Sequence, residues 1–100
     1  MAEEELAVLR ARIDEADERL VTVLAERFGV TRRVGQLKAE LGLPPIDAQR
    51  EAEVDAKVRR LAREHGLSED LVSDVLRAVI DRVVDEHRAQ GAAATGPGSP

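Results

Sequence analysis

The chain contains no cysteine, tryptophan or tyrosine, and Phe28 is its only aromatic residue. Without cysteine there is no disulfide framework, no thiol nucleophile and no thiolate metal site. With a single aromatic ring there is no platform on which successive nucleic-acid bases could stack. The formal net charge of −5 also argues against nucleic-acid binding, because phosphate binding requires a basic surface. We therefore predict that nucleic acid is not a partner.

Long apolar runs are also missing, since no stretch approaches the ~20 apolar residues that a membrane span needs. The N-terminus carries three consecutive glutamates at positions 3–5 and has no signal-peptide pattern. The two histidines, His65 and His87, are too few and too far apart for a metal cluster. We expect a soluble, cytoplasmic protein with no metal and no membrane partner.

What the chain does have is helical periodicity over nearly all of its first ninety residues. Stop and start signals divide this stretch: Gly42 is followed by two prolines, Asp47 and Ser68 are good N-caps, and Gly66 follows the second apolar stripe. The pattern predicts an all-α protein with one long helix over 3–41 and two shorter ones, over 47–65 and from 68 until it fades after 87. We assign 1–91 to one helical domain and 92–100, which lack apolar periodicity, to a disordered tail.

The long helix carries an apolar seam that it cannot bury by itself. At ~1.5 Å per residue it is about 55 Å long, whereas a compact globule of this size has a radius of gyration of only ~13 Å. A second copy of the chain is the simplest way to cover the seam. We therefore predict an intertwined helical homodimer, in which two long helices cross and the short ones pack over them. The seam consists of Leu6, Leu9, Ile13, Ala16, Leu20, Val23, Arg27, Val30, Val34, Leu37 and Leu41.

Arg27 breaks this otherwise apolar seam. A buried guanidinium without a counter-charge costs several kcal/mol, comparable with the net stability of a small domain. An anion is therefore expected beside it. Either a carboxylate of the protein pairs with Arg27, or the helix lines a cationic cavity for an acidic ligand.

The other helical stripes also carry polar residues. Lys38 lies eleven residues after Arg27, about three turns, so both side chains point the same way, ~16 Å apart along the axis. Glu51 opens the apolar stripe of the second helix, and His87 extends that of the third. Asp47 and Arg50 stand beside Glu51. Taken one by one, each is typical of a surface or helix-end charge. Together with Arg27, the inward-facing Lys38, Glu51 and His87 make a cationic excess that favours a ligand with more than one carboxylate.

Arg10 has a different geometry. It lies seventeen residues before Arg27, about 25 Å along the helix and about 100° round it, so it cannot reach the Arg27 site in its own chain. In an antiparallel dimer the partner's Arg10 could be carried there, which would give two equivalent sites lined by both chains.

These residues fit the pattern of a known family. The sequence resembles the all-helical, intertwined-dimer class of chorismate mutases from about residue 6 to 90, and the spacing between Arg10 and Glu51 contains no gaps. The motifs are Leu9-Arg10-x-x-Ile13-x-x-x-Asp17-x-x-Leu20, Leu24-Ala25-Glu26-Arg27, Val34-Gly35-x-x-Lys38 and Pro45-Ile46-Asp47-x-x-Arg50-Glu51.

The resemblance implies an isomerase of the shikimate pathway that converts chorismate to prephenate in aromatic amino acid biosynthesis, without a cofactor. It implies that Arg27 and the other chain's Arg10 clamp the two substrate carboxylates and that Lys38 donates to the ether oxygen. It further implies that Glu51 accepts from the ring hydroxyl, with Asp47 and Arg50 assisting at the start of the second helix.

The sequence departs from the family pattern at two positions of the third helix. Val83 replaces a small hydroxyl residue, and His87 replaces a glutamine that faces the ether oxygen. An imidazole can donate a hydrogen bond, and an imidazolium donates one with added charge, so activity is expected to depend on the ionisation of His87.

Three other functions stay open at this stage. The same scaffold serves mutases of 4-amino-4-deoxychorismate and isochorismate pyruvate-lyases, whose substrates also carry an enolpyruvyl ether and two carboxylates. A non-catalytic helical dimerisation module is the third, and direct pairing of Arg27 with Glu51 would favour it. The sequence does not indicate whether a partner enzyme regulates the activity.

Overall fold

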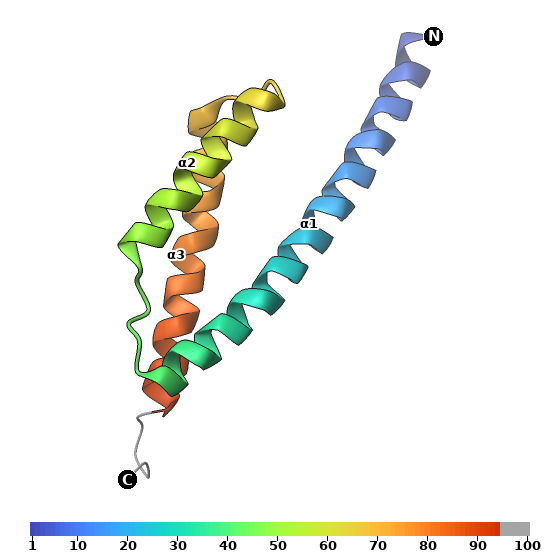
Figure 1. Ribbon diagram of the computed structural model, residues 1–100. Coiled ribbons are helices and arrows are strands. Elements are labelled where there is room, and N and C mark those ends of the chain that lie inside the picture. The colour runs from blue at the N-terminus through green and yellow to red at the C-terminus, as the bar shows by residue number, and fades with distance from the viewer. Residues whose placement is uncertain (95–100) are drawn as a thin grey trace. The chain divides into compact units, whose positions relative to one another are not determined.

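The computed structural model describes residues 1–94 of the chain. Within them the fold is all-helical and has no strand: α1 spans Ala2–Leu41, α2 spans Ala48–Glu64 and α3 spans Glu69–Ala94 (Figure 1). This confirms the all-α class and the order of one long and two shorter helices. The chain divides into two compact units, Met1–Thr31 and a second that begins at Arg32, so α1 runs through the boundary.

Local signals in the sequence set the helix ends. After α1, Gly42 adopts φ 68°, and the N–H of Leu43 donates to the carbonyl of Lys38 at 2.8 Å. After α2, Gly66 adopts φ 69°, and the N–H of Leu67 donates to the carbonyl of Ala62 at 2.8 Å. Both are Schellman-type ends, which need a residue with positive φ and therefore favour glycine.

The N-termini of the two shorter helices are capped by the predicted side chains. The Asp47 carboxylate accepts a hydrogen bond from the N–H of Arg50 at 3.0 Å. The Ser68 hydroxyl accepts one from the N–H of Leu71 at 3.2 Å. Each cap satisfies a backbone donor that the helix leaves unpaired.

The end of α3 differs from the prediction. The sequence predicted a helix that fades after His87 and a disordered tail from residue 92, but the helix continues to Ala94. Residues 92–94 are three alanines, the residue with the highest helix propensity, so the last turn persists without an apolar stripe. The remainder of the predicted tail, 95–100, lies outside the described residues.

In the second unit α2 and α3 lie side by side, with a small core between them (Figure 1). The buried residues include Ala62, Ile80, Val83 and His87. The other apolar residues along the stripes of the two helices are half-buried: Val54, Val58, Leu61, Val72, Leu76 and Val79. Ion pairs at the helix surfaces flank this core: Arg59 joins Asp55 and Asp70, both at 3.0 Å. The core thus holds one polar side chain, His87, among the apolar ones.

The first unit is a single stretch of α1 whose apolar seam is exposed. Leu9 is 43% exposed, Ile13 58%, Leu20 57% and Val23 58%. No helix within residues 1–94 is both long and apolar enough to cross a membrane.

Candidate active site

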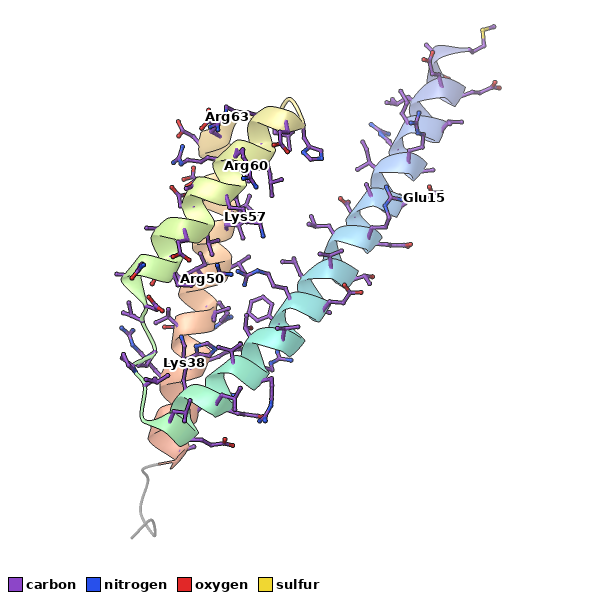
Figure 2. All side chains as sticks on the ribbon, viewed as in Figure 1. Glu15, Lys38, Arg50, Lys57, Arg60 and Arg63 are labelled. Atoms are coloured by element: carbon purple, nitrogen blue, oxygen red, sulfur yellow. The ribbon has the colours of Figure 1, made fainter. Side chains whose placement is uncertain are left out.

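Lys38 and His87, two of the predicted site residues, meet in the second unit. The Lys38 ammonium lies 3.4 Å from Nδ1 of His87 and donates a 3.1 Å hydrogen bond to the carbonyl of Pro45. His87 is only 5% exposed, and Lys38 is half-buried near the C-terminal end of α1 (Figure 2). An ammonium only donates hydrogen bonds, so Nδ1 of His87 can accept one from Lys38 when that nitrogen carries no proton.

Gly35 and Gln90 hold the helices around this pair close together. A Cβ atom added at Gly35 would lie 2.5 Å from Cδ2 of His87 and 2.8 Å from Cδ of Gln90. The Gln90 amide donates to the carbonyl of Arg32 at 3.0 Å. Gly35 lies three residues before Lys38, and Gln90 three after His87, so both contacts are one helical turn from the pair. The missing side chain at Gly35 therefore allows α3 to approach the end of α1.

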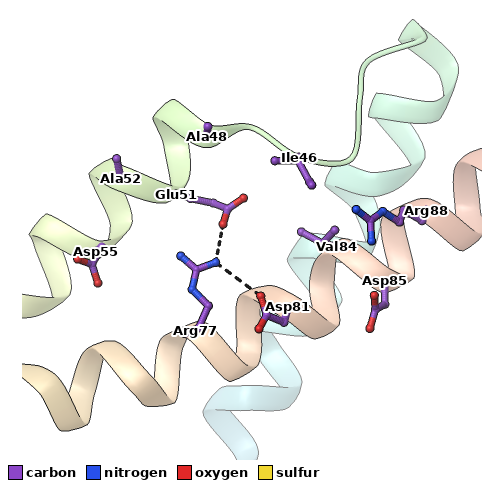
Figure 3. Close-up of a pocket in the computed structure, with 10 residues that line it drawn as sticks. All are labelled: Ile46, Ala48, Glu51, Ala52, Asp55, Arg77, Asp81, Val84, Asp85 and Arg88. Atoms are coloured by element: carbon purple, nitrogen blue, oxygen red, sulfur yellow. Dashed lines mark hydrogen bonds and ion pairs between the residues drawn. The ribbon is translucent and has the colours of Figure 1, made fainter.

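Glu51 is half-buried on the first turn of α2, and its partner is on α3. Its carboxylate lies 2.6 Å from Nη1 of Arg77, and the same nitrogen is 3.5 Å from Asp81 (Figure 3). The hydrogen bond to Glu51 raises the pKa of the Arg77 guanidinium above its ordinary value. Glu51 and Arg77 line a hollow of about 650 Å³ between the two helices, with Ile46 and Val84 among its apolar walls.

The remaining predicted residues of the second unit have ordinary structural surroundings. Asp47 is the N-cap of α2, and Arg50, which is exposed on the first turn of that helix, pairs with Glu53 at 3.6 Å (Figure 2). Val83 is buried on the inner stripe of α3.

The two arginines predicted to clamp a dicarboxylate lie in the first unit. Arg10 is exposed on α1. Arg27 is half-buried, and its Nη1 atom is buried without a hydrogen-bond partner among the described residues. The position of the two units relative to each other is not determined, so these residues are not placed against Lys38, Glu51 or His87.

Sequence reasoning missed Arg77, Gln90 and the carbonyl of Pro45. Arg77 lies next to the inner stripe of α3, four residues before Asp81. In the sequence it resembles the surface charges of that helix, so it was not recognised as a site residue. Among residues 1–94 no group of three or more histidine, cysteine, aspartate or glutamate residues could hold a metal ion. The second unit therefore offers a ligand a hydrogen-bond donor, the Lys38 ammonium, and an acceptor, the Glu51 carboxylate.

Comparison with known proteins places the chain in a family. Residues 9–88 match the family model of chorismate mutase type II. A chorismate mutase of Methanocaldococcus jannaschii is 32% identical over 78 residues, which is 78% of this chain and 79% of that protein. The T-protein of Enterobacter agglomerans is 41% identical over 76 residues, but the chain spans only 20% of its length. A 4-amino-4-deoxychorismate mutase of Streptomyces pristinaespiralis is 32% identical over 95 residues, 92% of this chain and 74% of that protein.

These matches define an enzyme of the chorismate mutase class. The chain belongs to the chorismate mutase type II family. The family and the isomerase class predicted from the sequence are both confirmed.

Proposed function

We propose that this protein converts chorismate to prephenate as a homodimer with two active sites, each lined by both chains. The observation that carries the proposal is the Lys38 ammonium, held 3.1 Å from the Pro45 carbonyl and 3.4 Å from His87 within a chain of this family. Chorismate is a dicarboxylate whose reaction breaks one ether C–O bond and forms one C–C bond within a single molecule. No proton transfer, nucleophile or metal is needed.

The protein's part in such a reaction is to hold the reactive conformer and to stabilise charge on the breaking bond. Arg27 and the other chain's Arg10 bind the two carboxylates, because guanidinium groups form bidentate pairs with carboxylates. Lys38 donates to the ether oxygen, where negative charge develops. His87 orients Lys38 and donates toward the same oxygen. Glu51 accepts from the ring hydroxyl, with Asp47 and Arg50 shaping that end of the site and Val83 packing beneath the substrate.

The dimer is proposed from the exposed seam of α1. Its residues 9, 13, 20 and 23 are 43–58% exposed, and a second copy would remove this apolar surface from water. The Nη1 atom of Arg27 is buried and has no hydrogen-bond partner within residues 1–94, which supports an anion at this position. Glu51 already has a partner in Arg77, which argues against the non-catalytic module in which Glu51 pairs with Arg27.

A second candidate function is the rearrangement of 4-amino-4-deoxychorismate, favoured by the relative from Streptomyces pristinaespiralis that matches 92% of the chain. The test is to incubate the protein separately with chorismate, isochorismate and 4-amino-4-deoxychorismate, and to identify the products. Prephenate from chorismate, with slower loss of the other two, is expected. Pyruvate released from isochorismate would indicate a lyase, and preferred turnover of the amine would assign the second candidate. Loss of none of the three would overturn the proposal.

A further inference from the structure

Arg77 lies outside the predicted site but holds the carboxylate that the proposed function assigns to the substrate ring. Its Nη1 atom is 2.6 Å from Glu51 and 3.5 Å from Asp81, so one guanidinium serves two carboxylates (Figure 3). The Glu51 side chain is 21% exposed and that of Arg77 is 50% exposed. The carboxylate is therefore partly shielded from water, which strengthens its interaction with nearby charges.

A ligand meeting Glu51 is affected by the charge of this whole cluster. A carboxylate by itself attracts a protonated amine more strongly than a neutral hydroxyl, because the amine adds a full charge to the hydrogen bond. The guanidinium of Arg77 opposes that preference, since it repels a second cation and compensates part of the negative charge. Arg77 leaves Glu51 able to accept a hydrogen bond, because a carboxylate has two oxygens and about four acceptor positions.

We propose that Arg77 sets the substrate choice of this enzyme by making Glu51 select a hydroxyl rather than an ammonium group on the ring. The inference rests on the proposed function, in which Glu51 contacts that ring substituent, and it adds a specificity-determining residue that does not itself touch the substrate. It acts through the charge and the position of Glu51.

A purely structural role for Arg77, as a link between α2 and α3, has a matched control in the same unit. Arg59 also joins the two helices: it bonds Asp55 on α2 and Asp70 on α3, both at 3.0 Å. Arg59→Gln therefore removes an ion-paired link of the same kind without touching Glu51. If Arg77 served only to link the helices, the two substitutions would have the same consequences.

The experiment is a charge series measured with two substrates. Arg77→Gln makes the cluster more negative by one charge, Asp81→Asn makes it less negative by one, and Arg77→Lys keeps the wild-type charge. For each variant the kcat/KM of chorismate is divided by that of 4-amino-4-deoxychorismate, at a pH where the amine is protonated. Where the amine is not turned over, its competitive inhibition constant against chorismate replaces its kcat/KM.

We expect the ratio to fall by about tenfold in Arg77→Gln and to rise by a similar factor in Asp81→Asn, because a single nearby charge changes recognition on this order. The ratio in Arg77→Lys and Arg59→Gln should stay within about twofold of wild type, since both keep the charge beside Glu51. If Arg77→Gln does not fold, Asp81→Asn still tests the charge dependence.

Two results would overturn the inference and leave the proposed function intact: a ratio that stays constant across the charge series, or an Arg59→Gln variant that moves it as much as Arg77→Gln does. A wild-type protein that neither rearranges nor binds either compound would overturn both.

Discussion

The Nζ atom of Lys38 lies 3.4 Å from Nδ1 of His87, although 49 residues separate them in the sequence. The contact joins the last turns of α1 to the inner stripe of α3, and Nδ1 can accept a hydrogen bond from the ammonium. The carbonyl of Pro45, 3.1 Å from the ammonium, is a second acceptor. Within residues 1–94 these two contacts engage two of the three donor positions of Lys38, and the third can serve a ligand.

Lys38 should act on the transition state. In Lys38→Ala the hydrogen bond that strengthens as charge develops on the ether oxygen is lost, so kcat should fall by ~10²-fold or more. Steady-state kinetics with chorismate measures this fall in kcat. The only other lysine, Lys57 on α2, is exposed and provides the control, because Lys57→Ala should leave kcat unchanged. A loss confined to KM would make Lys38 a ground-state binder instead.

His87 should be replaceable by glutamine but not by alanine. The glutamine amide can accept from Lys38 and still donate a hydrogen bond, so His87→Gln should keep activity, whereas His87→Ala should lose it together with the orientation of Lys38.

The control for His87 is the only other histidine. His65 is exposed at the end of α2, so His65→Gln should keep the rate of the wild type. An unaltered His87→Ala enzyme would rule out a functional role for this residue.

The shared active site can be tested by mixing inactive variants. Arg10→Ala and Arg27→Ala homodimers should each be nearly inactive, because each loses one carboxylate clamp from both sites. After subunit exchange, a heterodimer contains one site with both arginines intact, so activity should return. Size-exclusion chromatography with differently tagged chains would verify that heterodimers form. Heterodimers without recovered activity would contradict a site built from two chains.

Gly35 should not tolerate a side chain. In Gly35→Ala the new Cβ would lie 2.5 Å from the His87 ring, so the helices must separate and the thermal midpoint should fall despite the better helix propensity of alanine. Overpacking of this kind costs about 1–3 kcal/mol.

Gly29 is the matched control for Gly35, since it lies on the same helix and a Cβ there would meet nothing within 4 Å. Gly29→Ala should raise the midpoint, because an interior glycine costs about 1 kcal/mol relative to alanine. Circular dichroism melts of the two variants compare the effects directly. Equal midpoints would show that the approach of α3 to Gly35 is not tight.

Asp55 should make part of the stability depend on pH. A 2.5 Å hydrogen bond from the Ser73 hydroxyl, and then one from Arg59, hold the pKa of Asp55 below its ordinary value of 3.8. A carboxyl group with a lowered folded-state pKa stabilises the fold above its unfolded-state pKa, and this contribution is lost as the pH falls through the folded-state value. Ser73→Ala should therefore lower the thermal midpoint at pH 7, and the difference should shrink below about pH 4.

Ser68→Ala provides the pH-independent comparison for Ser73→Ala. It removes the cap of α3, a hydrogen bond from the N–H of Leu71 to a hydroxyl that does not titrate, and should cost about 1 kcal/mol at every pH. If Ser73→Ala lowered the thermal midpoint by the same amount at pH 7 and at pH 2, the hydrogen bond to Asp55 would not be the cause.

The sequence by itself determined the helices and the spacing of charges along them. Helix periodicity and caps are local properties, so Gly42, Asp47, Gly66 and Ser68 set the helix ends within a residue or two. The family pattern was readable for the same reason, because Arg27, Lys38 and Glu51 are recognised by residue type and separation alone. The end of α3 was misjudged because its last turn depends on alanine propensity rather than on an apolar stripe.

Only the tertiary structure decided which side chains meet. The Arg77–Glu51 pair spans 26 residues and the Lys38–His87 contact spans 49, and both depend on how two helices pack and in which register. Two helices can pack against each other in many registers, and each register brings different side chains together. The sequence pattern of one helix does not select among these registers. At Gly35 the register depends on the absence of a side chain, which lets α3 pack closely against the end of α1 and brings His87 to Lys38.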